Sequence, residues 1–209
     1  MCKPEKAQLE LLQSLARAAE GWDNSTEQHL HRVGRLSAAI ARSCDLPQRT
    51  AALIGQAATL HDVGKIGIPE RILQKPGPLS PEEVEVLKTH PALGAHLLRG
   101  GTTPLMRLAH EIALTHHERW DGGGYPHGLA GDAIPLSGRI VAVADMLDSL
   151  TRNRPSKAAW PLQQAVLEIR AQAGRHFDPA VVAAFERSAP ALPGLGADPA
   201  PAPTAPLGV

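Results

Sequence analysis

Apolar residues recur along most of this chain at three- and four-residue intervals, which is the pattern of amphipathic helices. Residues 5–20 form the first such segment. Residues 26–43 form the second, with Leu30, Val33 and Ile40 on its inward face. The pattern therefore predicts an all-α protein, built as a compact bundle of many helices.

Prolines and serines mark where further helices begin, since proline suits the first turn of a helix and serine caps it. Ser80 and Glu83 form a capping box, and the helix that they open leads toward His90. The other predicted helices run from near Pro47 to His61-Asp62, from Pro104 to His116-His117, over residues 138–150, and from Pro161 and Pro179, the last ending near Ser188.

A glycine-rich loop interrupts the helices over residues 118–136. Its segment Asp121-Gly122-Gly123-Gly124 reaches positive φ angles at little cost, and Pro126 then fixes the direction in which the chain leaves. We expect Asp121 to cap the turn rather than to act in catalysis, and Tyr125 to pack on the base of the loop. The loop is predicted to form a rim or a lid.

Composition fits one compact domain followed by a tail. With 43% hydrophobic residues among 209, the chain has ample material for a core. We divide it into an N-terminal helix over residues 1–22, a main domain over residues 23–188 and a tail over residues 189–209. The tail is rich in alanine, proline and glycine, which bury too little surface to fold, so we expect it to be disordered.

Charge and hydropathy exclude several classes of protein. The 21 basic and 21 acidic residues balance, which argues against a general nucleic-acid surface. No run approaches the ~18 apolar residues that a membrane span requires, and the first residues lack the apolar region of a signal peptide. We therefore expect a cytoplasmic protein that does not bind membranes, with Cys2 and Cys44 reduced.

Histidines and aspartates supply the most informative feature. His61 directly precedes Asp62, so the histidine can bind one metal ion while the short carboxylate bridges two. Two ions roughly 3.5–4 Å apart bind the attacking and leaving oxygens of a phosphodiester and turn a shared water into hydroxide near neutral pH. His116 and His117 are adjacent on a predicted helix, where neighbours point about 100° apart, so they converge on a metal only where that helix ends. The donors of this predicted binuclear hydrolytic site are His29, His61, Asp62, His90, His116, His117 and Asp145.

Three segments closely resemble the HD-GYP phosphodiesterases, a branch of the HD superfamily of metal-dependent phosphohydrolases. These segments are His61–Pro69, His116–Pro126 and Ala144–Thr151, and the resemblance extends over residues about 20 to 187. It implies an HD-type helical bundle with the glycine-rich loop beside the binuclear site. It also implies hydrolysis of cyclic di-GMP to the linear dinucleotide pGpG, to GMP or to both, by a hydroxide that bridges the metals.

The same resemblance implies a role for each donor. His29, His61, Asp62 and Asp145 match the ligands of one ion, and Asp62, His90, His116 and His117 match those of the other. Asp62 is thus both the bridge and a catalytic residue. Iron or manganese are the expected ions, and zinc or nickel also suit imidazole and carboxylate ligands. Ser25 stands where members with a third ion carry a glutamate, so we predict two divalent ions.

The resemblance also implies residues that act on the substrate. Lys65 matches a catalytic lysine whose ammonium would stabilise negative charge on the phosphoryl oxygens. Arg154 and Lys157 match positions that hold the substrate phosphates, and Arg152 belongs to the same cluster of cations. Tyr125 would lie against a guanine if it did not pack on its own loop.

Other functions remain open at this point. An HD phosphohydrolase that acts on another nucleotide would share the histidines and aspartates but would lack the Gly-Tyr-Pro loop. A non-catalytic receptor would bind the cyclic dinucleotide without turnover, although every ligand expected for two ions is present. A pure interaction module has only the Pro-Ala tail in its favour. A homodimer or a partner signalling protein is compatible with each of these functions.

Overall fold

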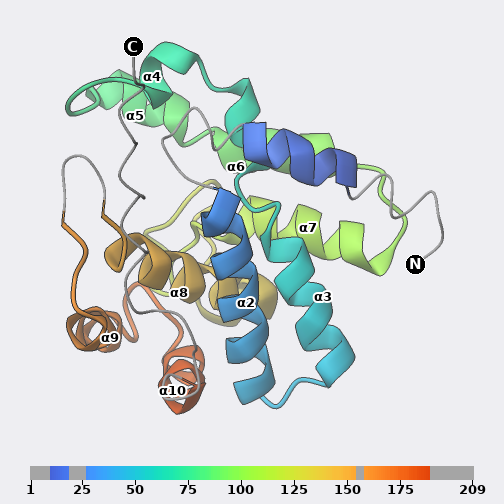
Figure 1. Ribbon diagram of the computed structural model, residues 1–209, viewed down its shortest axis with the longest axis vertical. Helices are drawn as coiled ribbons and strands as arrows, with labels where there is room; N and C mark the ends of the chain where they lie inside the picture. The colour runs from blue at the N-terminus through green and yellow to red at the C-terminus, as the bar shows by residue number, and fades with distance from the viewer. Residues whose placement is uncertain (1–9, 19–26, 154–157, 189–209) are drawn as a thin grey trace, which may run out of the picture.

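A computed structural model of the protein describes residues 10–18, 27–153 and 158–188, and most of these residues are helical (Figure 1). The predicted all-α fold is confirmed, since the extended pairings within these ranges are isolated bridges. After a helix over residues 10–18, the elements are α2 (Glu27–Ser43), α3 (Gln48–Ala58), η1 (Val63–Gly67), α4 (Glu70–Leu73), α5 (Pro81–Leu87), α6 (His90–Leu98), α7 (Pro104–Thr115), η2 (Gly131–Ala133), α8 (Leu136–Leu150), α9 (Leu162–Ala171) and α10 (Pro179–Ser188).

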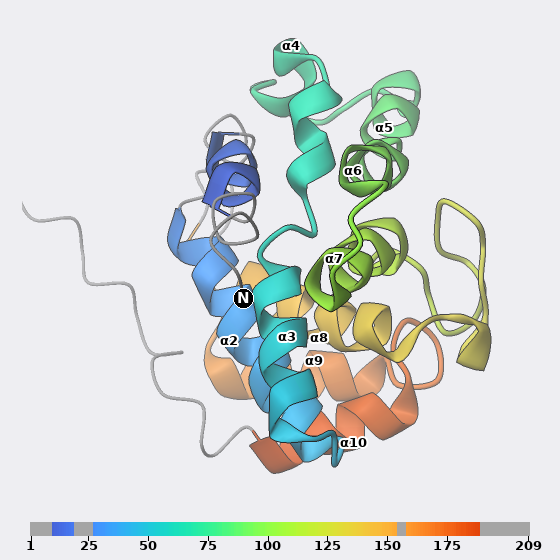
Figure 2. The same cartoon turned by 90° about the vertical axis from the view of Figure 1, so that its right-hand side faces the viewer.

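The core lies between α2, α3, α7 and α8. α2 packs against both α3 and α8, and α7 packs against the same two helices from the other side (Figures 1 and 2). Leu30, Val33 and Ile40 of α2 are buried in this core, as their spacing predicts. α10 covers α2 and α8, while α6 joins the bundle through α7 and η1. The helix over residues 10–18 contributes Ala16 to the same core.

Most helix boundaries agree with the sequence signals. At the start of α5, the Glu83 backbone N–H donates to Ser80 Oγ (3.3 Å) and the Ser80 N–H donates to Glu83 Oε2 (2.7 Å), which confirms the predicted capping box. α7 ends at Thr115 with His116 as its C-cap, so the adjacent histidines stand at a helix end as predicted. α8 begins at Leu136, directly after Pro135 and two residues before the predicted start.

α3 ends earlier than we predicted. The helix stops at Ala58 instead of continuing to His61 and Asp62, and a turn over residues 59–62 leads into η1. The last turn tightens because the Leu60 N–H donates to the Ala57 carbonyl (3.0 Å) and the His61 N–H donates to the Ala58 carbonyl (3.2 Å). His61 and Asp62 consequently project from a turn.

The glycine-rich loop uses its glycines in two ways. Gly122 has a φ of 79°, the conformation that we expected glycine to supply. Gly124 is required for a different reason: a Cβ there would lie 2.4 Å from the Arg119 nitrogen and 2.5 Å from the Glu118 Cα. Asp121 Oδ1 accepts a hydrogen bond from the Gly123 N–H (3.0 Å), which confirms its predicted role as a turn cap.

Glu118 anchors the second half of this loop by hydrogen bonds. Its carboxylate is buried and accepts hydrogen bonds from the backbone N–H groups of His127 (2.8 Å) and Leu129 (2.9 Å). Glu118 follows His117 directly in the chain, so these two hydrogen bonds connect the second half of the loop to the end of α7.

Some sequence predictions lie outside the described residues. They concern Ser25, Arg154, Lys157, the tail over residues 189–209 and both ends of the first predicted helix. The division into residues 1–22, 23–188 and 189–209 stays a prediction. Within the residues that the structure describes, every helix is too short or too polar to cross a membrane.

Candidate metal centre

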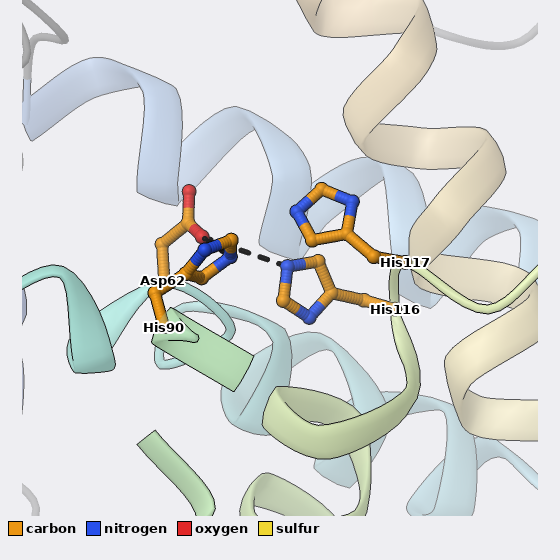
Figure 3. A group of neighbouring side chains, drawn as sticks. All are labelled: Asp62, His90, His116 and His117. Atoms are coloured by element: carbon orange, nitrogen blue, oxygen red, sulfur yellow. Dashed lines mark ion pairs between the residues drawn. The ribbon is translucent and has the colours of Figure 1, made fainter. Parts of the chain in front are cut away.

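The seven predicted donors lie together in two adjoining groups. The first group is Asp62, His90, His116 and His117, and the second is His29, His61 and Asp145. Within each group, one potential ligand atom per residue lies within 4.8 Å of the others. Figure 3 shows the first group, in which Asp62, His90 and the adjacent His116 and His117 turn toward one another from three segments of the chain. The long-range convergence predicted from the sequence is therefore present.

Asp62 lies between the two groups. Its Oδ1 is 3.1 Å from His90 Nε2 and 3.5 Å from His116 Nε2, both in the first group. Its Oδ2 is 3.3 Å from His61 Nε2, in the second group. The two carboxylate oxygens thus face different groups, which is the arrangement that a bridging ligand requires.

Three of the histidines are oriented by backbone carbonyls. The Nδ1 atoms of His61 and His90 lie 2.8 Å from the Ala58 oxygen and 2.7 Å from the Leu87 oxygen. His116 Nδ1 lies 3.1 Å from the carbonyl oxygens of both Ile112 and Ala113, in the last turn of α7. Because a carbonyl only accepts hydrogen bonds, each Nδ1 carries the proton and each Nε2 presents a lone pair to the site.

These lone pairs point at a carboxylate, and this arrangement is the test of whether a cation fits. Asp62 Oδ1, His90 Nε2 and His116 Nε2 are buried and have no hydrogen-bond partner within the described part of the chain. Two acceptors 3.1 Å apart repel each other unless a positive charge lies near both. Neutral imidazoles around a carboxylate are the donor set of divalent transition metals. The residues present therefore fit a metal ion.

The second group draws on distant parts of the chain. Asp145 on α8 is 27% exposed, and its Oδ1 lies 3.7 Å from His29 Nε2 and 3.9 Å from His61 Nε2. His29 belongs to the first turns of α2, so this group depends on the packing of α2 against α8.

The site favours an ionised Asp62 beside neutral His116 and His117. Burial by itself would raise the pKa of Asp62, but the Lys65 ammonium, with Nζ 2.8 Å from Oδ2, and His61 outweigh it and hold that pKa well below its ordinary value. Burial lowers the pKa of His116, against the pull of Asp62. Burial, helped by His116 and His90, holds the pKa of His117 well below its ordinary value. These are the protonation states that metal binding requires.

A close backbone approach sets the distance between two of the ligand-bearing segments. A Cβ on Gly64 would lie 2.0 Å from the His90 carbonyl oxygen and 2.3 Å from the Gly94 nitrogen. η1 and the start of α6 therefore touch through their backbones, which brings Asp62 and His90 together.

A cavity of about 420 Å³ opens onto both groups. Lys65 and Tyr125 line it, as expected for residues predicted to contact a substrate. The Tyr125 ring also stacks on the His117 ring, with centroids 4.8 Å apart and planes inclined by 24°. The structural role expected for Tyr125 and contact with a ligand are thus compatible. Further lining residues come from the end of α4 and the segment that links it to α5, namely Leu73, Lys75, Gly77 and Leu79.

Sequence reasoning gave no role to Asp148 and a different one to Arg152. Asp148 lies one helical turn after Asp145, and its Oδ2 is 2.6 Å from His29 Nδ1. Arg152 is 8% exposed, and its Nη1 lies 3.7 Å from Asp148 Oδ2, so it supports this buried carboxylate instead of facing a phosphate. The spacing of Asp148 from Asp145 was visible in the sequence, but its partner is 119 residues away.

Comparison with known proteins gives consistent relatives. A curated "Cyclic di-GMP phosphodiesterase" of Thermotoga maritima is 48% identical over 176 residues, which cover 84% of this chain and 48% of the relative. The "Cyclic di-GMP phosphodiesterase response regulator RpfG" of Xanthomonas campestris is 45% identical over 90% of this chain and 50% of its own length. A "3'3'-cGAMP-specific phosphodiesterase 2" of Vibrio cholerae is 44% identical over 83% of this chain and 33% of its own length. The chain spans about half or less of the length of these relatives.

Solved structures share the fold at low sequence identity. A cyclic GMP-AMP specific phosphodiesterase of V. cholerae matches with a TM-score of 0.62 and 21% identity, over 89% of this chain and 51% of that chain. The HD domain of the Listeria monocytogenes phosphodiesterase PgpH matches with a TM-score of 0.60 and 16% identity, over 87% of this chain and 96% of that one.

A family model described as "HD domain" matches residues 10–181, which include all seven donors. HD-domain phosphohydrolases depend on metal ions, in agreement with the cluster of histidines and aspartates described above. The resemblance to HD-GYP proteins that the motifs indicated is confirmed by the identities of the curated relatives. The chain belongs to the HD domain family, in its HD-GYP branch.

Proposed function

We propose that this chain hydrolyses the phosphodiester bonds of cyclic di-GMP, giving pGpG, GMP or both. The observation that carries the proposal is the position of Asp62, whose two oxygens face two separate groups of potential metal ligands. The names of the most similar curated relatives support the same substrate.

Two divalent ions complete the proposed site. His29, His61, Asp62 and Asp145 would hold one ion, and Asp62, His90, His116 and His117 would hold the other. When bound, such a pair of ions neutralises phosphate charge and lowers the pKa of a water that attacks phosphorus. Iron or manganese are our preferred ions, and zinc or nickel also match these ligands.

The remaining residues would bind and orient the substrate. Lys65 lies beside Asp62 with its side chain 12% exposed, so its ammonium can reach a phosphoryl oxygen in the cavity while it keeps Asp62 ionised. Tyr125 forms part of the wall against which a base would lie. Arg154 and Lys157 are proposed, from the sequence alone, to hold the outer phosphate.

A second cyclic dinucleotide deserves the same test. A relative whose name specifies 3'3'-cGAMP is 44% identical, close to the value for the relatives named for cyclic di-GMP. cGAMP differs from cyclic di-GMP by one purine base, and the two metal groups act on the shared phosphates. We therefore propose cyclic di-GMP as the substrate and cGAMP as the competing one. Such a messenger would be met in the cytoplasm, and a homodimer or a signalling partner stays a prediction.

One experiment tests ion content, turnover and product together. The chain is purified without oxygen, its metals are measured, and its products from cyclic di-GMP, cGAMP and pGpG are separated by chromatography. We expect two ions per chain and hydrolysis of cyclic di-GMP, both lost in D62A. Tight binding of cyclic di-GMP by the metal-loaded chain without any product would instead identify a receptor and contradict the proposal.

A further inference from the structure

Asp148 is a buried carboxylate that contacts one metal-binding residue and two arginines. It lies on α8, is 0% exposed, and its Oδ2 is 2.6 Å from His29 Nδ1. Arg32 Nε donates to Asp148 Oδ1 and Arg32 Nη2 lies 3.4 Å from Oδ2, while Arg152 Nη1 is 3.7 Å from Oδ2. The two guanidinium groups compensate the charge of a carboxylate that burial would otherwise destabilise.

This contact distinguishes His29 from three other donors of the site. His61, His90 and His116 direct Nδ1 to neutral backbone carbonyls three or four residues earlier in the chain. His29 directs Nδ1 to a charged side chain that lies 119 residues later. A carboxylate fixes the ring tautomer as a carbonyl does, but it also makes the imidazole a stronger electron donor.

We propose that Asp148 is a positioning residue for the second group of donors. It holds the proton of His29 on Nδ1 and aims Nε2 at Asp145, whose Oδ1 lies 3.7 Å away. Occupation of the group His29, His61 and Asp145 by an ion then depends on Asp148, whereas the group of His90, His116 and His117 is oriented independently of it. The inference rests on the two-ion site of the proposed function and deepens it.

A purely structural role is the alternative that has to be separated. Asp148 also links α8 to α2 through Arg32, so its loss could loosen the helix pair without any specific effect on His29. The variant R32M is the matched control. It removes the ion pair between the helices but leaves the hydrogen bond from His29 to Asp148 and the neighbouring Arg152 in place.

The first test reads the ring tautomers directly. Long-range ¹H–¹⁵N NMR spectra of the metal-free full chain at mildly alkaline pH report which nitrogen of each histidine carries the proton. We expect His29, His61, His90 and His116 all to carry it on Nδ1, and D148A to release only His29 from this tautomer. The other three histidines are internal controls for an intact fold. Protonation of His29 on Nε2 in the wild type, or an unchanged His29 in folded D148A, would overturn the inference.

The second test measures metal affinity and remains available if D148A does not fold. Metal-free wild type, D148N and R32M are titrated with Mn²⁺ in a calorimeter, and their melting temperatures are recorded. Asn keeps the shape of Asp148 but not its charge. We expect D148N to weaken one of the two binding events by roughly 10- to 100-fold, the usual effect of losing a carboxylate that is hydrogen-bonded to a metal-binding histidine. We expect R32M to leave both binding events unchanged.

Two results of this titration would overturn the inference. One is an equal loss at both binding events in D148N, and the other is the same selective loss in R32M as in D148N. Absence of cyclic di-GMP hydrolysis by a chain that binds both ions would refute the proposed function alone, because neither the tautomer nor the Mn²⁺ titration requires turnover.

Discussion

The two donor groups are built from different kinds of structure. In the first group, His90 and His116 are each held by a carbonyl of their own helix end or turn, and η1 touches α6 through Gly64. In the second group, His29 and Asp145 stand on α2 and α8, and His29 is held by a side chain from the other helix. Each group has one partly exposed member, His117 in the first and Asp145 in the second, and the remaining donors are buried.

This difference concerns how the histidine rings are oriented. Carbonyls nearby in the chain orient His90 and His116, and also His61 of the second group, whereas a side chain from another helix orients His29. Local backbone contacts keep the first group oriented as long as the turns persist. The second group needs two helices in register, so small shifts of α2 against α8 change it first. We expect the first group to bind its ion more tightly and the second to lose its ion more readily.

The largest effect should follow from removing the residue that joins the groups. D62A takes one oxygen from each group and removes the negative charge that both ions would share, so binding of both ions should be lost together. Hydrolysis of cyclic di-GMP should fall by more than roughly 1,000-fold, the scale seen when one member of a catalytic set is removed. Metal analysis and product chromatography check both results. Full turnover in D62A would exclude Asp62 from the mechanism.

A smaller effect is expected from Lys65, which lies beside the oxygen that faces the second group. K65M should keep both ions but lower kcat by roughly 100-fold, because a charge aimed at the phosphoryl oxygens is lost. Steady-state kinetics with measured metal content separates the two effects. Loss of metal in K65M would show that the lysine acts mainly by keeping Asp62 ionised.

Gly64 offers a way to disturb the approach of Asp62 to His90. G64A places a methyl group against the His90 carbonyl and should destabilise the fold by about 3 kcal/mol while it separates Asp62 from His90. G67A is the matched control, since its Cβ would meet only the flexible end of Leu93, at 3.0 Å. Urea unfolding compares the two variants. Equal stability of G64A and G67A would contradict the backbone contact.

The smallest expected effect concerns a histidine away from both groups. Burial, with a contribution from Arg119, lowers the pKa of His176 to about 4, and its ring stacks on Phe177. The unfolded chain binds this proton at its ordinary pKa of about 6.5, so the contribution of His176 to stability is complete above that pH and is lost as pH falls toward 4.

H176Q should therefore make the melting temperature of the metal-free chain less sensitive to acid. Between pH about 7.5 and about 4.5 we expect its drop to be smaller than that of the wild type by roughly 2–4 °C, the shift that about 1 kcal/mol produces in a domain of this size. Calorimetry at the two pH values measures it. The remaining slope then includes His116 and His117, whose pKa values are also lowered, together with carboxylates of lowered pKa such as Glu82 and Glu83. Identical slopes in H176Q and wild type would remove His176 from the acid response.

Much of this structure was readable from short-range signals. The box at Ser80, the helix end at His116 and the turn cap at Asp121 each depend on neighbours within a few residues, and each prediction is confirmed. The end of α3 was misplaced because the alanine-rich pattern continues past the point where Leu60 and His61 tighten the turn.

Site residues that are far apart in the sequence can be grouped only from a family pattern or from the structure itself. Motif order brought His29 and Asp145 into one predicted group, but nothing in their spacing pointed to Asp148 as the partner of His29. Arg152 was grouped with phosphate-binding cations because charge can be read from a sequence and burial cannot. A carboxylate that orients a metal-binding histidine can be recognised only once the helices that carry the two residues are packed together.

The double hydrogen bond of Glu118 has a consequence for how ligands of different size are accommodated. Because the backbone N–H groups of His127 and Leu129 are hydrogen-bonded to the residue after His117, we expect the Tyr125 side of the cavity to move little when a ligand binds. The lining segment from Leu73 to Leu79 differs in that it contains an exposed bend at Gly77. We therefore expect substitutions between Leu73 and Leu79 to change the preference between guanine and adenine more than substitutions beside Tyr125 do.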